Sequence, residues 1–148
     1  MSNYTVRELE VNDYNKGYLD LLENLTQVGT ISEDYFKVQY EYLRNRQDSY
    51  VRVIEDRTTN RIVATGSIYI EYKFIHQVGK VGHIEDLVVH SDYRNQGLGS
   101  KIVENLKLLA NANGCYKITL SSPDSSEEFF SKRGFKVNEK QMSLYYFR

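Results

Sequence analysis

The alternation of hydrophobic and polar residues predicts strands in the first half of the chain. Four segments are rich in β-branched and aromatic residues, which favour strands: 5–9, 50–56, 61–72 and 80–89. The polar turn Arg57-Thr58-Thr59-Asn60 lies between the second and third segments and predicts a hairpin. The fourth segment is expected to continue the same antiparallel sheet.

Three other segments repeat apolar residues every three or four positions, which is typical of helices with one buried face. The first spans about 14–25. The second spans about 36–43 and has Ser32 as a candidate N-cap. The third spans about 98–109 and ends at Asn113-Gly114, a sequence that suits a helix C-terminus.

The rest of the chain predicts a strand at 117–120, a short helix at about 124–132 and a terminal strand at 142–147. Together these elements indicate an α/β sandwich. Because a strand, helix and strand in succession form a right-handed parallel crossover, the strands around Leu87 and Ile118 are expected to be neighbours.

Composition indicates one globular domain, residues 1–148, with room for a single substantial core. The formal net charge of −1 argues against general attraction to nucleic acid or to an anionic membrane. No apolar run approaches the roughly 18 residues of a membrane span, and the N-terminus has no signal-peptide core. The single cysteine points to the reducing cytoplasm, and three scattered histidines without ligand spacing predict no metal site.

A glycine-rich segment, Arg94-Asn95-Gln96-Gly97-Leu98-Gly99, joins an apolar strand to a helix. The N–H groups of such a turn converge at the positive end of the helix dipole, where a phosphate can bind. No Gly-Lys-Ser/Thr follows, so it is not a P-loop, and the three-glycine dinucleotide fingerprint is absent. The segment predicts a diphosphate-binding turn. The alternative is an ordinary strand-to-helix turn whose glycines allow close packing.

The sequence Gly82-His83-Ile84-Glu85-Asp86-Leu87-Val88-Val89, followed by this glycine turn, resembles motif A of the GNAT superfamily of N-acetyltransferases. Gly82–Asp86, Leu25–Gly29 and Gly114–Ile118 are most similar to its glucosamine-6-phosphate N-acetyltransferase family. The resemblance runs over roughly residues 4 to 144. It implies the GNAT fold: a mixed, mostly antiparallel sheet with a splayed central strand pair and helices on both faces.

The resemblance also implies a reaction, the transfer of acetyl from acetyl-CoA to the 2-amino group of D-glucosamine 6-phosphate in UDP-N-acetylglucosamine biosynthesis. Acetyl-CoA is the expected co-substrate, and a homodimer is expected to share the site for the phosphorylated amino sugar between its subunits. In the family, acetyl-CoA enters the gap between the splayed strands. The matching residues here are Leu87, Val88, Val89, Arg94, Asn95, Gln96, Gly97, Leu98, Gly99 and Ser100.

Two adjacent acids, Glu85 and Asp86, are the candidate catalytic residues. Neighbours on a regular strand point to opposite faces, so both can serve one site only if the strand carries a bulge. The resemblance implies that they orient the sugar amine, that one of them or a water it holds takes the proton, and that the N–H near Leu87 polarises the acetyl carbonyl. The alternative is a pair of acids at a strand end facing water.

The resemblance assigns further polar residues to the sugar site. Cationic groups can fix the phosphate, and a phenol or imidazole can bond hydroxyls. With Glu85 and Asp86, the candidates are Thr26, Lys73, His76, Tyr116 and Lys117. Taken without the family, the lysines are ordinary solvent-facing residues beside strands.

Three positions depart from the family pattern. Ser121 stands where the strand after Tyr116-Lys117 usually ends in an acidic residue. Phe130 stands where many members carry a tyrosine that bonds the departing CoA sulfur, and Tyr145 stands where an arginine contacts the substrate phosphate. Two other functions therefore stay open. One is a GNAT acetyltransferase for another small amine or a peptide amine, and the other is a non-catalytic CoA-binding module.

Overall fold

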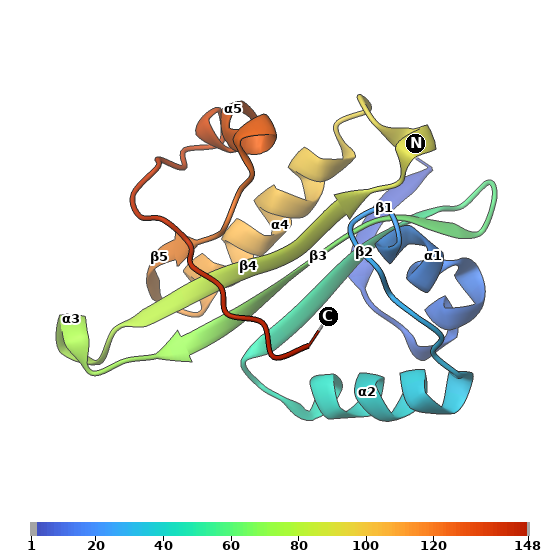
Figure 1. Cartoon of the computed structure of the whole chain (residues 1–148), viewed down its shortest axis with the longest axis horizontal. Coiled ribbons are helices and arrows are strands. Elements are labelled where there is room, and N and C mark those ends of the chain that lie inside the picture. The colour runs from blue at the N-terminus through green and yellow to red at the C-terminus, as the bar shows by residue number, and fades with distance from the viewer. Residues whose placement is uncertain (1–2, 148) are drawn as a thin grey trace.

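The computed structural model of the chain describes residues 3–147. These residues form a five-stranded sheet in the order β1-β2-β3-β4-β5, with helices on both faces (Figure 1). The strands are β1 Tyr4–Glu8, β2 Ser49–Asp56, β3 Arg61–Tyr72, β4 Lys80–Val89 and β5 Cys115–Thr119. All the strand segments predicted in the first 120 residues are present, within a few residues at their ends.

The sheet is antiparallel from β1 to β4, whereas β4 and β5 are parallel. The parallel ladder begins at Lys80↔Cys115 and ends at His83↔Thr119. Beyond His83, β4 pairs only with β3, so the central strands separate. The predicted splayed sheet is confirmed, and β4 and β5 are neighbours as expected, although Leu87 lies past the end of their pairing.

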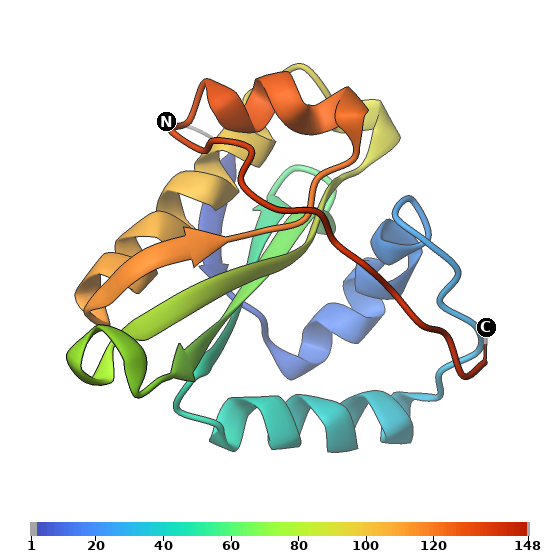
Figure 2. The same ribbon diagram turned by 60° about the vertical axis from the view of Figure 1, so that its left-hand side comes forward.

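Helices cover each face of the sheet (Figure 2). On one face, α4 Leu98–Ala112 buries Leu98, Ile102 and Leu106 against strand residues such as Ile54 and Ile84. The other face is covered by a 3-10 turn, η1, and two helices, and it buries Leu21, Val53, Ile62 and Val88. The elements of that layer are η1 Val11–Lys16, α1 Tyr18–Leu22 and α2 Glu33–Asn45. The remaining short elements are α3 Ile75–Val78, η2 Ser91–Tyr93, η3 Asp124–Ser126 and α5 Glu127–Ser131.

The prediction of one continuous helix over 14–25 is wrong. Gly17 adopts a left-handed conformation, with φ of 80°, and separates η1 from α1. Asp13, which is fully buried, accepts hydrogen bonds from the backbone N–H of Glu10 and from the guanidinium of Arg7 at 2.8–2.9 Å. This buried ion pair holds a tight turn at the place where periodicity alone predicts a helix.

The predictions for the two long helices are confirmed. The Ser32 hydroxyl accepts a hydrogen bond from the Tyr35 N–H at 3.2 Å and caps α2. Helix α4 stops at Asn113, and Gly114 follows with φ of 78°. None of the helices within residues 3–147 is long and apolar enough to cross a membrane.

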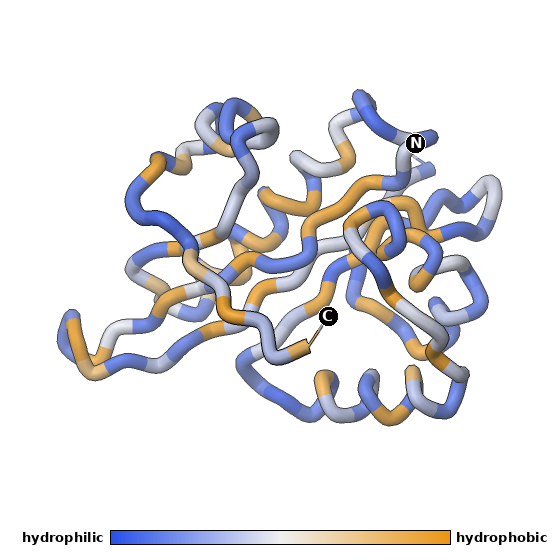
Figure 3. The backbone as a smooth tube through the Cα atoms, viewed as in Figure 1, coloured by the Kyte–Doolittle hydropathy of each residue, from blue (hydrophilic) through white to orange (hydrophobic). Residues whose placement is uncertain are grey.

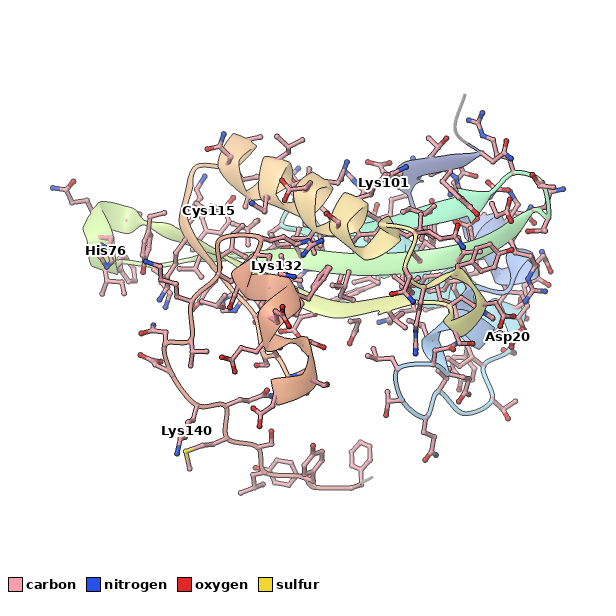
Figure 4. All side chains as sticks on the ribbon, turned by 90° about the horizontal axis from the view of Figure 1, so that it is seen from above. Asp20, His76, Lys101, Cys115, Lys132 and Lys140 are labelled. Atoms are coloured by element: carbon pink, nitrogen blue, oxygen red, sulfur yellow. The ribbon has the colours of Figure 1, made fainter. Side chains whose placement is uncertain are left out.

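The C-terminal tail, residues 136–147, does not form the predicted terminal strand. Between residues 142 and 147 the described backbone joins no ladder, and the tail stands off the sheet (Figure 4). Hydrophobic positions occur along it (Figure 3), and Met142 and Phe147 are 92% and 88% exposed. The sequence pattern of a strand is therefore present, but within one chain the tail does not reach a sheet edge.

Candidate active site

A bulge in β4 lies at the two predicted catalytic acids. Thr65 pairs with Val88 and Ser67 pairs with Glu85, so one residue of β3, Gly66, faces two residues of β4. Asp86 takes a left-handed conformation with φ of 52°. Both acids are exposed. The bulge that the adjacent acids require is thus confirmed, and it turns Asp86 toward the face on which Glu85 lies.

Gly66 makes the bulge possible, and sequence reasoning did not single it out. A Cβ at this position would lie 2.7 Å from Cγ2 of Ile102 and 3.1 Å from Cδ1 of Leu87. The Leu87 side chain therefore occupies the space above the glycine, on the α4 side of the sheet. Glycine is required here by close packing, because its own φ is not in the left-handed region.

A cavity of about 290 Å³ opens beside Asp86, between the sheet and the α1–α2 layer. Its wall mixes hydroxyl, amide and apolar groups, as small-molecule sites do. The lining residues include Tyr18, Leu22, Gln39, Leu43, Ser67 and Tyr69. These residues come from three separate elements, α1, α2 and β3, so no local motif could have identified them.

Tyr18 gives this cavity a neutral hydroxyl. Burial raises the pKa of Tyr18 to about 12, and the negative charge of Asp86 acts in the same direction. The phenol therefore keeps its proton at neutral pH and remains available as a hydrogen-bond donor near the carboxylate of Asp86.

The glycine turn has the geometry of an anion-binding site. Asn95 and Gly97 are left-handed, with φ of 63° and 77°, and α4 begins at Leu98. The N–H groups of a first helical turn have no partner within the helix. A Cβ on Gly97 would meet nothing within 4 Å, so a phosphate can approach this backbone. These residues fit the diphosphate of acetyl-CoA.

The side chains of the predicted acetyl-CoA residues differ in their surroundings. Val88 and Leu98 are buried, at 7% and 1% exposed, so they can contribute only backbone groups. Arg94 and Gln96 are exposed. The hydroxyl of Tyr4 donates a hydrogen bond to Oε1 of Gln96 at 3.1 Å, which ties the turn to β1. The backbone N–H groups of this turn, with Arg94 beside them, are therefore the groups best placed to bind an anion.

Three of the predicted sugar-site residues form a cluster at the far end of the sheet, here called the tip cluster: His76, Tyr116 and Lys117. The rings of His76 and Tyr116 stack with centroids 4.1 Å apart, and Nζ of Lys117 lies 5.9 Å from the Tyr116 centroid. β4 begins at this end with Lys80, and Asp86 lies six residues further along it. Because a strand rises about 3.3 Å per residue, Asp86 is roughly 20 Å from the tip cluster.

Thr26 lies at the opposite end of the molecule. It follows α1, where its N–H donates to the carbonyl oxygen of Leu22 at 3.1 Å, and α1 and α3 stand at opposite ends of the sheet (Figure 1). Lys73 lies at the same end of the sheet as the tip cluster, because its N–H donates to the carbonyl oxygen of Gly79 at 2.9 Å, and its Nζ lies 3.4 Å from Oε2 of Glu71. One chain therefore does not bring the tip cluster to the acids.

Phe130 is buried among aromatic rings. It is 9% exposed, and its ring centroid lies 5.0 Å from that of Phe129 and 5.9 Å from that of Phe135. Phe129 is the residue of α5 that borders the glycine turn, because a Cβ on Gly99 would lie 3.4 Å from its ring. No proton donor for the CoA sulfur can be assigned from this helix.

Two other groups of residues do not enter the site. Burial raises the pKa of the Cys115 thiol, which suits a packed side chain and not a nucleophile. Among residues 3–147, no three His, Cys, Asp or Glu side chains gather closely enough to hold a metal ion.

Comparison with known proteins agrees with this geometry. A sequence model described as "Acetyltransferase (GNAT) family" matches residues 6–135. Glucosamine 6-phosphate N-acetyltransferase of Arabidopsis thaliana is 40% identical over 144 residues, covering 97% of each chain. Glucosamine 6-phosphate N-acetyltransferase 1 of Dictyostelium discoideum is 37% identical, covering 94% of this chain and 88% of its own.

The three-dimensional structure is also similar to that of a known acetyltransferase. The crystal structure of the Arabidopsis thaliana enzyme superposes with a TM-score of 0.95 over 97% of this chain and 98% of that one. The β4 bulge, the glycine turn before α4 and the early end of the β4–β5 ladder thus occur in a chain that matches acetyltransferases over nearly its full length. This chain belongs to the GNAT family of acetyltransferases.

Proposed function

We propose that this protein transfers the acetyl group of acetyl-CoA to the 2-amino group of D-glucosamine 6-phosphate. The products are CoA and N-acetyl-D-glucosamine 6-phosphate, a precursor in UDP-N-acetylglucosamine biosynthesis. Relatives named for this reaction match at 37–40% identity over nearly the whole chain. The observation that carries the proposal is the β4 bulge, which sets two adjacent carboxylates where β4 has lost its parallel neighbour, with Asp86 lining a small cavity.

The acids supply what an amine nucleophile needs. The amine must be neutral and held in place when it attacks the thioester carbonyl carbon. We assign this to Asp86 and Glu85, which accept N–H bonds from the amine and take up its proton directly or through a held water. As the C–N bond forms, the C–S bond breaks and CoA leaves as the thiolate, which takes up the proton that the amine has lost, passed on by the acid or by water. The backbone N–H near Leu87 is assigned to the acetyl oxygen.

Acetyl-CoA binding is assigned to the open half of β4 and the glycine turn. The backbone of Leu87, Val88 and Val89 has no β5 partner, so its edge is free for hydrogen bonds to an extended ligand. The diphosphate is assigned to the amides of residues 95–100, with Arg94 beside them.

The sugar site is proposed to be completed across a homodimer. The tip cluster lies roughly 20 Å along β4 from Asp86, too far for one sugar phosphate to touch both within a chain. A two-fold axis can bring the tip cluster of one subunit to the acids of its partner. The C-terminal tail, which joins no strand ladder of the described sheet and exposes Met142, Leu144 and Phe147, is the segment proposed to be buried between the subunits.

Thiol release from acetyl-CoA tests the reaction. The assay compares glucosamine 6-phosphate with unphosphorylated glucosamine and with a lysine-containing peptide. Fastest turnover with glucosamine 6-phosphate is expected. Preference for the peptide would replace the proposal with a peptide-amine acetyltransferase, and binding of acetyl-CoA without turnover on any amine would indicate a non-catalytic module.

Light scattering tests the shared site. A dimer of about 35 kDa is expected, twice the 17.3 kDa of one chain. A fully active monomer would contradict the shared site. The proposed setting is the reducing cytoplasm, on the strength of the single cysteine.

A further inference from the structure

His83 occupies the last pair of the parallel ladder, opposite Thr119, and none of the roles above uses it. Its ring stacks on Tyr69 with centroids 4.4 Å apart and planes 7° apart. Nε2 lies 2.8 Å from Oε1 of Glu71, and Nδ1 lies 3.1 Å from the hydroxyl oxygen of Thr119. Three strands thus hold this ring, on the face that carries Glu85.

The partners of His83 specify its tautomer. A carboxylate only accepts hydrogen bonds, so Nε2 carries the proton that is donated to Glu71. Nδ1 is then free to accept the hydroxyl hydrogen of Thr119. The Nε2–H tautomer satisfies both neighbours at once, because the Thr119 hydroxyl can donate to Nδ1 while the carboxylate of Glu71 accepts from Nε2.

Glu71 is shared between two donors. One carboxylate oxygen, Oε1, accepts from His83 at 2.8 Å, and the other, Oε2, lies 3.4 Å from Nζ of Lys73. The hydrogen bond from His83 is the largest of the effects that lower the pKa of Glu71. His83 therefore takes the closer position and leaves Lys73 in a looser ion pair.

We infer that His83 is a positioning residue for phosphate recognition, which it serves by engaging Glu71 so that Lys73 stays only loosely paired and available to the phosphate of the acceptor. This inference rests on the proposed function. Without His83, Glu71 pairs fully with Lys73, and its negative charge competes with the phosphate for the same ammonium group. The side chains of Lys73 and His83 are 28% and 22% exposed, so both are within reach of a ligand on this face.

Steady-state kinetics of His83→Gln test the inference. The KM for glucosamine 6-phosphate is expected to rise about fivefold, on the scale of one partly exposed ion pair. The KM for unphosphorylated glucosamine and the affinity for acetyl-CoA are expected to stay within about twofold, since neither involves Lys73. The decisive variant is Glu71→Gln/His83→Gln. It lacks the competing charge and is expected to recover most of the KM for the phosphorylated sugar.

A matched control is Glu104→Gln, which removes a carboxylate that pairs with Lys107 at 3.3 Å on α4, and no change is expected there. If His83→Gln does not fold, Thr119→Val takes its place. That variant frees Nδ1, and a smaller rise in the same KM is expected. Long-range nitrogen–proton NMR of the wild type is expected to show the Nε2–H tautomer.

Several results would overturn the inference. One is an unchanged preference for the phosphorylated sugar in His83→Gln, and another is a double variant whose KM for that sugar does not recover. An unchanged KM in Thr119→Val, where that variant is used, or an Nδ1–H tautomer in the wild type would also do so. If the wild type itself shows no preference for the phosphorylated sugar, the proposed function fails as well. If that preference is present and survives the loss of His83, only this inference fails.

Discussion

The two halves of β4 differ in ways that separate structure from chemistry. Residues 80–83 pair with strands on both sides, in regular register with β3. Residues 84–89 pair with β3 alone and contain the bulge at Asp86 and Leu87. The first half is a closed piece of sheet, whereas the second half leaves backbone groups and two carboxylates available to ligands.

The difference arises from the length of one neighbour. β5 has five residues and ends at Thr119, and Pro123 follows four residues later. Proline has no N–H for a ladder and suits a chain that is leaving the sheet. Once β5 has left, the edge of β4 is open. A short strand therefore creates the site, and the bulge then aims side chains into it.

The largest effect should come from removing both charges of the bulge. Glu85→Gln/Asp86→Asn is expected to lower kcat at least about a hundredfold, because the proton acceptor is lost, with acetyl-CoA affinity kept. Glu33→Gln/Asp34→Asn on α2 is a matched pair of adjacent acids and should have no such effect. Thiol-release kinetics measure kcat, and calorimetry measures the acetyl-CoA affinity of each variant. Near-normal turnover would remove these residues from the mechanism.

A second comparison adds one methyl group opposite the bulge and one in the closed half of β4. Gly66→Ala puts a Cβ 2.7 Å from a γ-methyl of fully buried Ile102, opposite the bulge. We expect a loss of about 1–3 kcal/mol in the free energy of unfolding, and reduced turnover. Gly82→Ala makes its one close contact at 2.9 Å with Cδ1, the terminal methyl of Ile68, and should cost less. Urea unfolding measures both, and equal losses would show that the bulge has no special need for glycine.

A third change affects the glycine turn. Gly97→Val is expected to weaken acetyl-CoA binding at least about tenfold, since a branched side chain at φ of 77° strains the backbone that approaches the phosphate. Gly114→Val is the control, because Gly114 has φ of 78° and the same open surroundings at the other end of α4. If calorimetry shows equal acetyl-CoA affinities in both folded variants, the diphosphate does not bind at this turn.

The smallest effect is expected at Phe130. Phe130→Tyr adds a hydroxyl within a cluster of aromatic rings, and activity should stay the same or rise by less than about tenfold. Loss of most activity in a folded variant with normal acetyl-CoA affinity would show that the phenyl ring itself is required. It would also show that this position does not correspond to the tyrosine of other family members.

Local signals were enough for much of the fold. The Ser32 cap, the 57–60 hairpin turn and Gly114 after α4 each depend on a few consecutive residues, and all were predicted. The break at Gly17 was missed because it depends on Asp13 binding Arg7 and on the left-handed glycine. Neither the ion pair nor the glycine conformation can be predicted from the spacing of apolar residues.

The site was predictable only where a motif marks it. Adjacent acids on a strand required a bulge, and the structure has one. Gly66, Tyr18 and the Glu71–His83–Thr119 contacts were missed, because each depends on which residues face each other across strands or between layers. The tail was assigned to a strand by its pattern, yet a pattern does not say which sheet edge, or which subunit, provides the partner.

The most direct test of the comparison is an NMR titration of ¹⁵N-labelled protein with acetyl-CoA. The account predicts that the largest amide shifts fall on residues 87–89 and 94–100, with residues 80–83 and β1 much less affected. Largest shifts in the closed half of β4, or none in the glycine turn at saturating acetyl-CoA, would contradict it.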